Sequence, residues 1–180
     1  MNLKSCITVL ATFALTTVLI APAFAAQASP SHLYGKLLSG QAEEVVAAAE
    51  AMPADKYNFA PTTGDFKGVR TFGQQITHIA SAQYFFFGGF GTKATIDPKS
   101  LDKLTSKDDI VKALKDSFAF AQQAVGTITT ENAFEEIAQI DGTNTRASIT
   151  AFSLAHTNDH YGQMVVYLRM NGIVPPASRK

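Results

Sequence analysis

Two histidines lie four positions apart near the end of the chain, in the stretch "AFSLAHTNDHYGQMVVYLRMNGIVPPAS". In an α-helix, His156 and His160 would lie about 40° apart around the axis with β-carbons about 6 Å apart, so both imidazoles could bind one metal ion. The same helical face carries Ile149 and Phe152. We therefore expect this face to pack into the core, where a pair of imidazoles needs an explanation.

Two buried imidazoles are unfavourable unless their ring nitrogens are satisfied, because two imidazolium cations cannot share a dry site. A divalent metal ion would satisfy them. The alternatives are a partly exposed pair, or one core histidine that is bonded to a carbonyl group. A third histidine, His78 in "TFGQQITHIASAQYFFF", is expected on another helix with Gln75 and Ala82 on its side. Alone it would indicate a core histidine, but His78, His156 and His160 together favour a metal site.

Ligation by histidine alone suits zinc or nickel, with iron or copper as further options, rather than calcium or magnesium. Three protein ligands leave a position for water or substrate, and such a metal can lower the pKa of its water to about 7, polarise a carbonyl group or hold a thiolate. We therefore expect a metal-dependent hydrolase or transferase that acts on a small molecule. The alternative is a non-catalytic bundle that binds metal or a partner.

The neighbours of the three histidines do not identify a catalytic acid or base. Asp159 could orient a ligand, although a solvent-facing position is the commoner explanation for such a residue. Gln163 and Tyr167 face the same way as the histidine pair, either as outer contacts of the site or as packing residues. His32 is expected to be exposed and not to bind metal.

Four helical segments must position these residues. Their limits are set by good helix formers, by candidate caps such as Ser31, and by proline and glycine at the ends. Between the second and third segments, residues 88–107 are too rich in glycine and polar residues to continue a helix and too long for a tight turn. The expected helices cover residues 31–52, about 70–88, 107–128 and 145–172.

No segment shows the sustained alternation that predicts a strand. Residues 129–144 are interpreted as a connector that ends in the turn signal Asp141-Gly142. Four helices with one long crossover between the second and third predict an all-α fold, a four-helix bundle whose sites lie between facing helices.

The first 25 residues have the parts of a secretory signal peptide. Lys4 precedes a short apolar run, and Ala23 and Ala25 form a small-residue cleavage site. We therefore expect residues 1–25 to be removed, residues 26–180 to form one domain, and the protein to be exported to the periplasm or secreted. An uncleaved anchor is the alternative, but the apolar run is short for a membrane span. After cleavage we expect no contact with the membrane.

Removal of the signal peptide also removes Cys6, the only cysteine, so the mature chain has neither a disulfide nor a cysteine nucleophile. The chain has 15 basic and 15 acidic residues, and loss of Lys4 leaves 14 basic residues. This balance gives no basic surface for nucleic acid, which we do not expect as a partner.

Three stretches resemble the DinB/YfiT-like family of metalloenzymes: "MPADKYNFAPT", "TFGQQITHIASAQYFF" and "HTNDHYGQMVVYLRMNGIVPPAS". The last is the most specific, since its paired histidines, Tyr-Gly-Gln and Tyr-Leu-Arg steps and closing Pro-Pro recur together in the family. The resemblance implies an up-down-down-up four-helix bundle. It also implies a metal bound by one histidine of the second helix and the pair of the fourth, which are His78, His156 and His160 in this chain.

The resemblance further implies thiol-dependent transferases or isomerases as characterised relatives, and homodimers as a common assembly. Low-molecular-weight thiols are kept mainly in the cytoplasm, so an exported member would need its own supply of thiol. A second apolar stripe on the fourth helix, which includes Leu154, Tyr161 and Leu168, would meet a second subunit or pack within the same bundle.

Overall fold

The computed structural model describes residues 29–94, 96–140 and 142–179. The expected signal peptide, residues 1–25, lies outside the described residues. Four long helices dominate the chain, and short 3-10 helices and two short strands connect them. The helices are α1 (Pro30–Ala51), η1 (Ala54–Lys56), α2 (Phe72–Phe87), η2 (Gly88–Phe90), η3 (Pro98–Lys103), α3 (Lys107–Val125), α4 (Arg146–Met170) and η4 (Pro176–Ser178), and the strands are β1 (Glu136–Ile140) and β2 (Thr143–Thr145).

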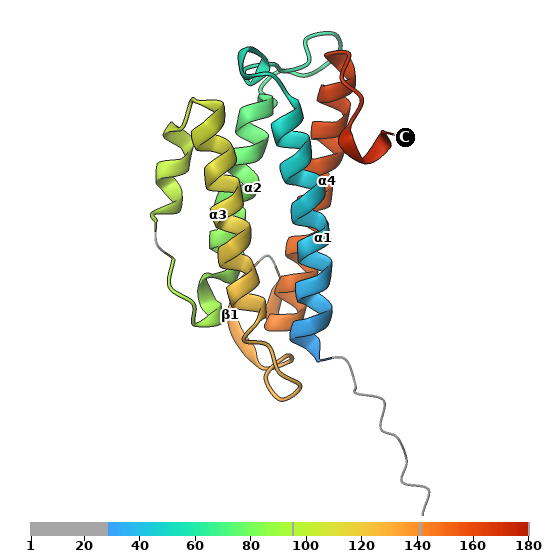
Figure 1. Ribbon diagram of the computed structural model, residues 1–180. Helices are drawn as coiled ribbons and strands as arrows, with labels where there is room; N and C mark the ends of the chain where they lie inside the picture. The colour runs from blue at the N-terminus through green and yellow to red at the C-terminus, as the bar shows by residue number, and fades with distance from the viewer. Residues whose placement is uncertain (1–28, 95, 141, 180) are drawn as a thin grey trace, which may run out of the picture.

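The four long helices form an up-down-down-up bundle (Figure 1). From the lower end in this view, α1 runs upward and α2 returns downward. The connection through η2 and η3 then climbs back to the upper end, so that α3 also runs downward and α4 runs upward. The all-α fold and the long crossover predicted from the sequence are therefore confirmed.

Local signals begin and end the helices close to the predicted limits. Thr71 and Thr145 each form a capping box with the third helical residue of α2 and α4, which satisfies backbone donors at those ends. After α4, Gly172 adopts a left-handed conformation (φ +73°) that ends the helix. The expected cap at Ser31 is wrong: Ser29 caps α1 and accepts a hydrogen bond from the His32 amide, because Pro30 suits the first helical position.

The core lies between the helices, and α2 is buried on most sides because α3, α4 and η3 all pack against it. Three of its large apolar side chains, Phe72, Ile76 and Phe87, are fully buried. The seam between α2 and α4 is more polar: Gln83 donates to the Thr157 hydroxyl and accepts from the Ser153 hydroxyl. These three buried polar side chains are therefore paired, as a dry interior requires.

The expectation that no strand forms is wrong for residues 136–145. β1 and β2 pair as an antiparallel hairpin, with Glu136 opposite Thr145 and Ile140 opposite Thr143. A three-residue strand is too short to show sustained alternation in the sequence. The sequence indicated only the turn of this hairpin, at Gly142 (φ +80°). Across the described part of the chain, no helix combines the length and hydropathy required to cross a membrane.

Candidate metal centre

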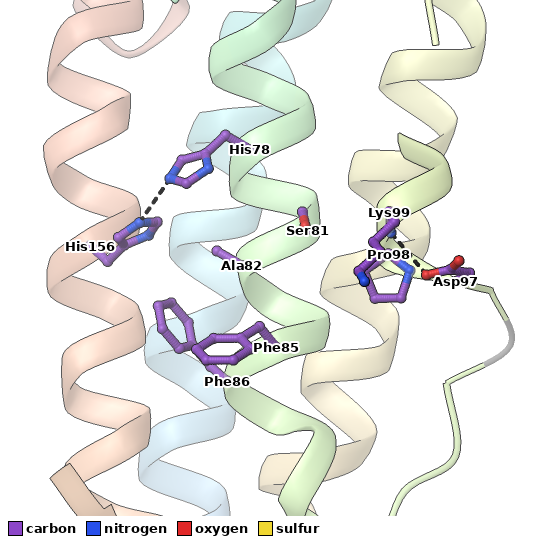
Figure 2. Close-up of a pocket in the computed structure, with 9 residues that line it drawn as sticks. All are labelled: His78, Ser81, Ala82, Phe85, Phe86, Asp97, Pro98, Lys99 and His156. Carbon is purple, nitrogen blue, oxygen red and sulfur yellow. Dashed lines mark hydrogen bonds between the residues drawn. The ribbon is translucent and has the colours of Figure 1, made fainter. Parts of the chain in front are cut away.

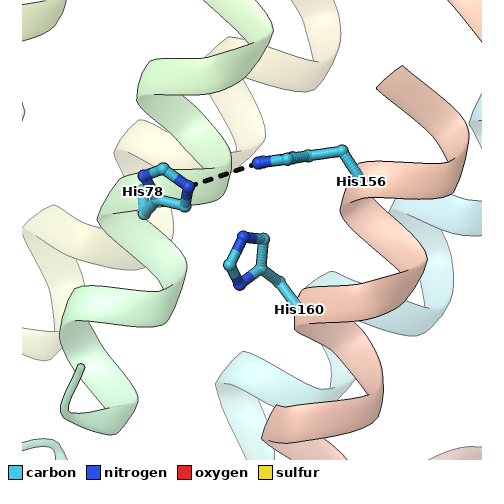
Figure 3. Close-up of side chains that lie close together, drawn as sticks. All are labelled: His78, His156 and His160. Carbon is cyan, nitrogen blue, oxygen red and sulfur yellow. Dashed lines mark hydrogen bonds between the residues drawn. The ribbon is translucent and has the colours of Figure 1, made fainter. Parts of the chain in front are cut away.

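The structure brings the three predicted histidines together at the α2–α4 seam. His78 extends from the middle of α2, and His156 and His160 extend from successive turns of α4 (Figure 3). One ring nitrogen from each histidine lies within 4.8 Å of those of the other two. The ring centroids are 4.6 to 5.1 Å apart. These residues are separated by up to 82 positions in the sequence, so the bundle itself assembles the cluster.

The spacing of the nitrogens fits a transition metal. The Nε2 atoms of His78 and His156 are 3.2 Å apart. Two nitrogens bound to one zinc ion at about 2.1 Å would lie about 3.4 Å apart at a tetrahedral angle. The donor set is three imidazole nitrogens with no carboxylate, which suits zinc, nickel, copper or iron(II) rather than calcium. The residues present therefore fit the metal that the sequence predicts.

The ring of His160 is held from its far side by Gln75 of α2. The Nδ1 atom of His160 lies 2.7 Å from Oε1 of Gln75. An amide oxygen can only accept, so Nδ1 carries the proton and Nε2 keeps its lone pair for the centre of the cluster. Both residues are buried, Gln75 with 2% and His160 with 7% of its surface exposed. Such a partner orients a ligating imidazole and fixes its tautomer.

The polar contacts continue from Gln75 back to α4. Its Nε2 atom donates to Oε1 of Gln163 at 2.7 Å, and Nε2 of Gln163 donates to the Asp159 carboxylate at 3.0 Å. Gln163 is thus an outer contact of the site. Asp159 touches Gln163 rather than a histidine, and it is solvent-exposed as expected. Tyr167 is a packing residue whose hydroxyl donates to the Arg70 carbonyl.

Burial keeps the imidazoles of His78 and His160 neutral. It lowers the pKa of His78 to about 4, with further lowering from the positive charge of Arg70 and from His156. Burial, followed by His156 and His78, likewise lowers the pKa of His160 to about 4. Neutral imidazole is the form that binds a metal, so protons do not compete for these two ligands at pH 7.

A cavity of about 490 Å³ opens beside the cluster, between α2, α4 and the start of η3 (Figure 2). Two of the histidines, His78 and His156, form part of its wall. The rest is mostly apolar, with Phe85 and Phe86 side by side in the view and Lys99 on the opposite wall. The lining residues are His78, Ser81, Ala82, Phe85, Phe86, Asp97, Pro98, Lys99 and His156.

A second, more polar opening of about 360 Å³ shares His78 and Ser81 with the first. It adds Arg70, which precedes α2, and Asp102 of η3, so both signs of charge face the histidine cluster from this side. In the described residues, the Arg70 side chain forms no ion pair. Sequence reasoning missed Arg70 and Asp102, because only the crossover places η3 beside α2. His32 is exposed on α1, as predicted.

Comparisons with known proteins agree with this architecture. A crystal structure at 2.01 Å resolution of a DinB-like protein from Bacillus cereus ATCC 10987 superposes with a TM-score of 0.70. The match covers 83% of this chain and 97% of that one at 18% sequence identity, which supports the fold alone. No curated protein matches the chain. The sequence model of the DinB superfamily matches residues 37–164, a span that includes all three histidines. The chain belongs to the DinB superfamily.

Proposed function

We propose that this protein is an exported, metal-dependent enzyme of the DinB superfamily, a hydrolase or a transferase that acts on a small molecule. His78, His156 and His160 would hold a divalent transition metal, with zinc or nickel preferred and iron or copper as further options. The observation that supports this proposal is a cluster of three imidazoles beside an open cavity, in which burial keeps His78 and His160 neutral.

Each part of the site would have a distinct role. The bound metal would supply Lewis acidity, either to polarise a substrate carbonyl group or to lower the pKa of a water or thiol. The apolar wall formed by Phe85 and Phe86 would hold the carbon skeleton of the substrate and exclude water from it. Arg70 and Asp102, on the polar side of His78, would bind charged groups of the substrate.

The cavity also bears on the alternative, a non-catalytic bundle that binds metal or a partner. A site that only stores metal or stabilises the fold would have a closed set of ligands and no adjacent space. Here His78 and His156 both line a cavity that is large enough for a small molecule. This arrangement favours catalysis over storage.

Elemental analysis of untagged protein, purified from the periplasmic or secreted fraction, tests the metal. We expect about one equivalent of a transition metal per chain, and less than about a tenth in His156→Ala. His32→Ala is the matched control and should retain the wild-type content, because His32 is exposed on α1. Wild-type protein with less than about a tenth of an equivalent would contradict the proposal.

Export and assembly are separate proposals. N-terminal sequencing of the mature protein should begin at Ala26, and a sequence beginning at Met1 would contradict cleavage. A homodimer is proposed from family membership, with the exposed side chains of Leu33 and Leu37 next to Leu154 as an apolar surface. Light scattering at micromolar concentration would test it, and a monomeric mass would contradict it.

A further inference from the structure

A chain of hydrogen bonds runs from the buried imidazole of His160 to the surface of the protein. It passes from His160 to Gln75 at 2.7 Å, from Gln75 to Gln163 at 2.7 Å, and from Gln163 to Asp159 at 3.0 Å. Its inner members, Gln75 and His160, are buried, whereas Asp159 is exposed. The chain therefore connects a candidate metal ligand to an acidic group that lies outside the cavity.

The direction of donation along this series of hydrogen bonds depends on which end of the series can only accept a hydrogen bond. Each glutamine can present either its oxygen or its NH₂ group to a neighbour, so the two amides alone allow both directions. A carboxylate has no proton to donate. Asp159 therefore requires the NH₂ group of Gln163, which turns the oxygen of Gln163 toward Gln75. In the same way, the NH₂ group of Gln75 faces Gln163, and its oxygen faces His160.

The last link determines the tautomer of the imidazole. Because the oxygen of Gln75 faces Nδ1 of His160, that nitrogen must carry the proton, and Nε2 carries the lone pair. Only this tautomer can offer Nε2 to an ion shared with His78 and His156. If the hydrogen bonds were donated in the opposite direction, the NH₂ group of Gln75 would face Nδ1 of His160. Nε2 would then hold a proton where the metal should bind.

We propose that Asp159 is a positioning residue that, through Gln163 and Gln75, sets His160 in the tautomer able to bind metal. This inference rests on the proposed metal site, but the tautomer can be measured without metal. Asp159 is also suited to mutation, because it is exposed and its replacement does not disturb the core. Gln75, in contrast, is buried, so its replacement would change both the orientation of His160 and the stability of the fold, and the two effects could not be separated.

The sharpest test replaces the acceptor at the end of this series, the Asp159 carboxylate, with a group that can only donate. In Asp159→Lys the ammonium group can only donate, so the two amides should turn over and His160 should carry its proton on Nε2. Asp159→Glu keeps an acceptor and should keep the wild-type tautomer. Asp102→Lys is the charge control: it makes the same change in charge near the cluster, on η3, without touching the chain of hydrogen bonds.

Long-range ¹H–¹⁵N correlation spectra of metal-free protein near neutral pH distinguish the two tautomers of His160 by their ring-nitrogen shifts. We expect the Nδ1–H form in wild type, Asp159→Glu and Asp102→Lys, and the Nε2–H form in Asp159→Lys. Zinc titration should show affinity at least about tenfold weaker in Asp159→Lys than in Asp102→Lys.

The outcomes separate this inference from the proposed function. An Nδ1–H tautomer that persists in Asp159→Lys would overturn the positioning role, even if the wild-type protein binds zinc tightly. Reversal of the tautomer in Asp159→Lys, together with a wild-type protein that does not bind zinc, would support the positioning role and contradict the metal site. Reversal in Asp102→Lys as well would show that charge alone decides the tautomer, which would also overturn the inference.

Discussion

Phe85 and Phe86 are adjacent in α2, and both line the cavity, yet their surroundings differ. Phe85 is 62% exposed, whereas Phe86 is 4% exposed and packs edge-on against His156 and Phe152. We expect Phe85→Ala to change the free energy of unfolding by less than about 0.5 kcal/mol. Phe86→Ala should lower it by about 3 to 5 kcal/mol, because it leaves a void in the core.

Urea unfolding of the two variants, followed by circular dichroism, measures this difference. Equal losses of stability in both variants would mean that Phe85 is not exposed in solution, for example because another subunit covers it. If the prediction is correct, Phe85→Ala becomes the variant with which the apolar wall can be altered without unfolding. A loss of substrate affinity in that variant could then be assigned to the cavity.

At the same scale, the sequence predicted the histidine cluster better than its surroundings. His78, His156 and His160 could be identified because imidazoles at helical spacing on an apolar face are unusual. Gln75 was placed on the His78 side, but its bond to His160 could not be predicted, since that bond depends on how closely α2 and α4 approach. Helical periodicity gives the direction of a side chain around its own helix and not its partner on another helix.

The first turn of α2 lies against the loop that leads into it, and Gly73 makes this contact possible. Its amide donates to the Tyr57 carbonyl at 2.8 Å. A β-carbon at Gly73 would meet that same carbonyl oxygen at 3.2 Å and the Tyr57 ring at 3.3 Å. The Tyr57 hydroxyl is itself bonded to the Ala49 carbonyl at 2.7 Å, so the ring cannot move away freely.

We therefore expect Gly73→Ala to destabilise the protein by about 1 kcal/mol, because crowding outweighs the gain in helix propensity. Gly40→Ala in α1 is the matched control. Outside the neighbouring backbone of α1, no atom lies within 4 Å of the added β-carbon, so this variant should gain about 0.5 to 1 kcal/mol. Thermal unfolding of both variants measures the difference. An equal gain in both would show that the loop does not hold Tyr57 against α2.

At the scale of elements, the long helices were predictable because caps, prolines and glycines mark their ends. Thr145 and Gly172 bound α4 within two residues of the predicted limits. The β1–β2 hairpin and η3 were not predicted, because each is too short for its periodicity to exceed chance. The omission of η3 matters most for function, since η3 brings Asp102 to the polar opening beside His78.

At the scale of the whole molecule, the histidine cluster links stability to pH. The pKa of His78 and of His160 is about 4 in the folded protein, below the ordinary value of 6.5. Between these values the unfolded chain binds more protons than the folded chain, so acid favours unfolding. The stability of the metal-free protein should therefore be constant with respect to these groups above pH 6.5, and should be lost progressively as the pH falls toward 4.

Denaturant unfolding of metal-free protein at several pH values between 7.5 and 5 would measure this loss. The range stays above the ordinary pKa of carboxylic acids, so histidines dominate the proton balance. A variant with alanine at His78, His156 and His160 should lose less stability over this range, and His32→Ala should follow the wild type, because His32 is exposed. Parallel curves for wild type and the triple variant would mean that the cluster is not buried as a neutral group. Added zinc should raise the stability of the wild type and of His32→Ala across this pH range and leave the triple variant unchanged, because the ion binds only the folded arrangement of the three imidazoles.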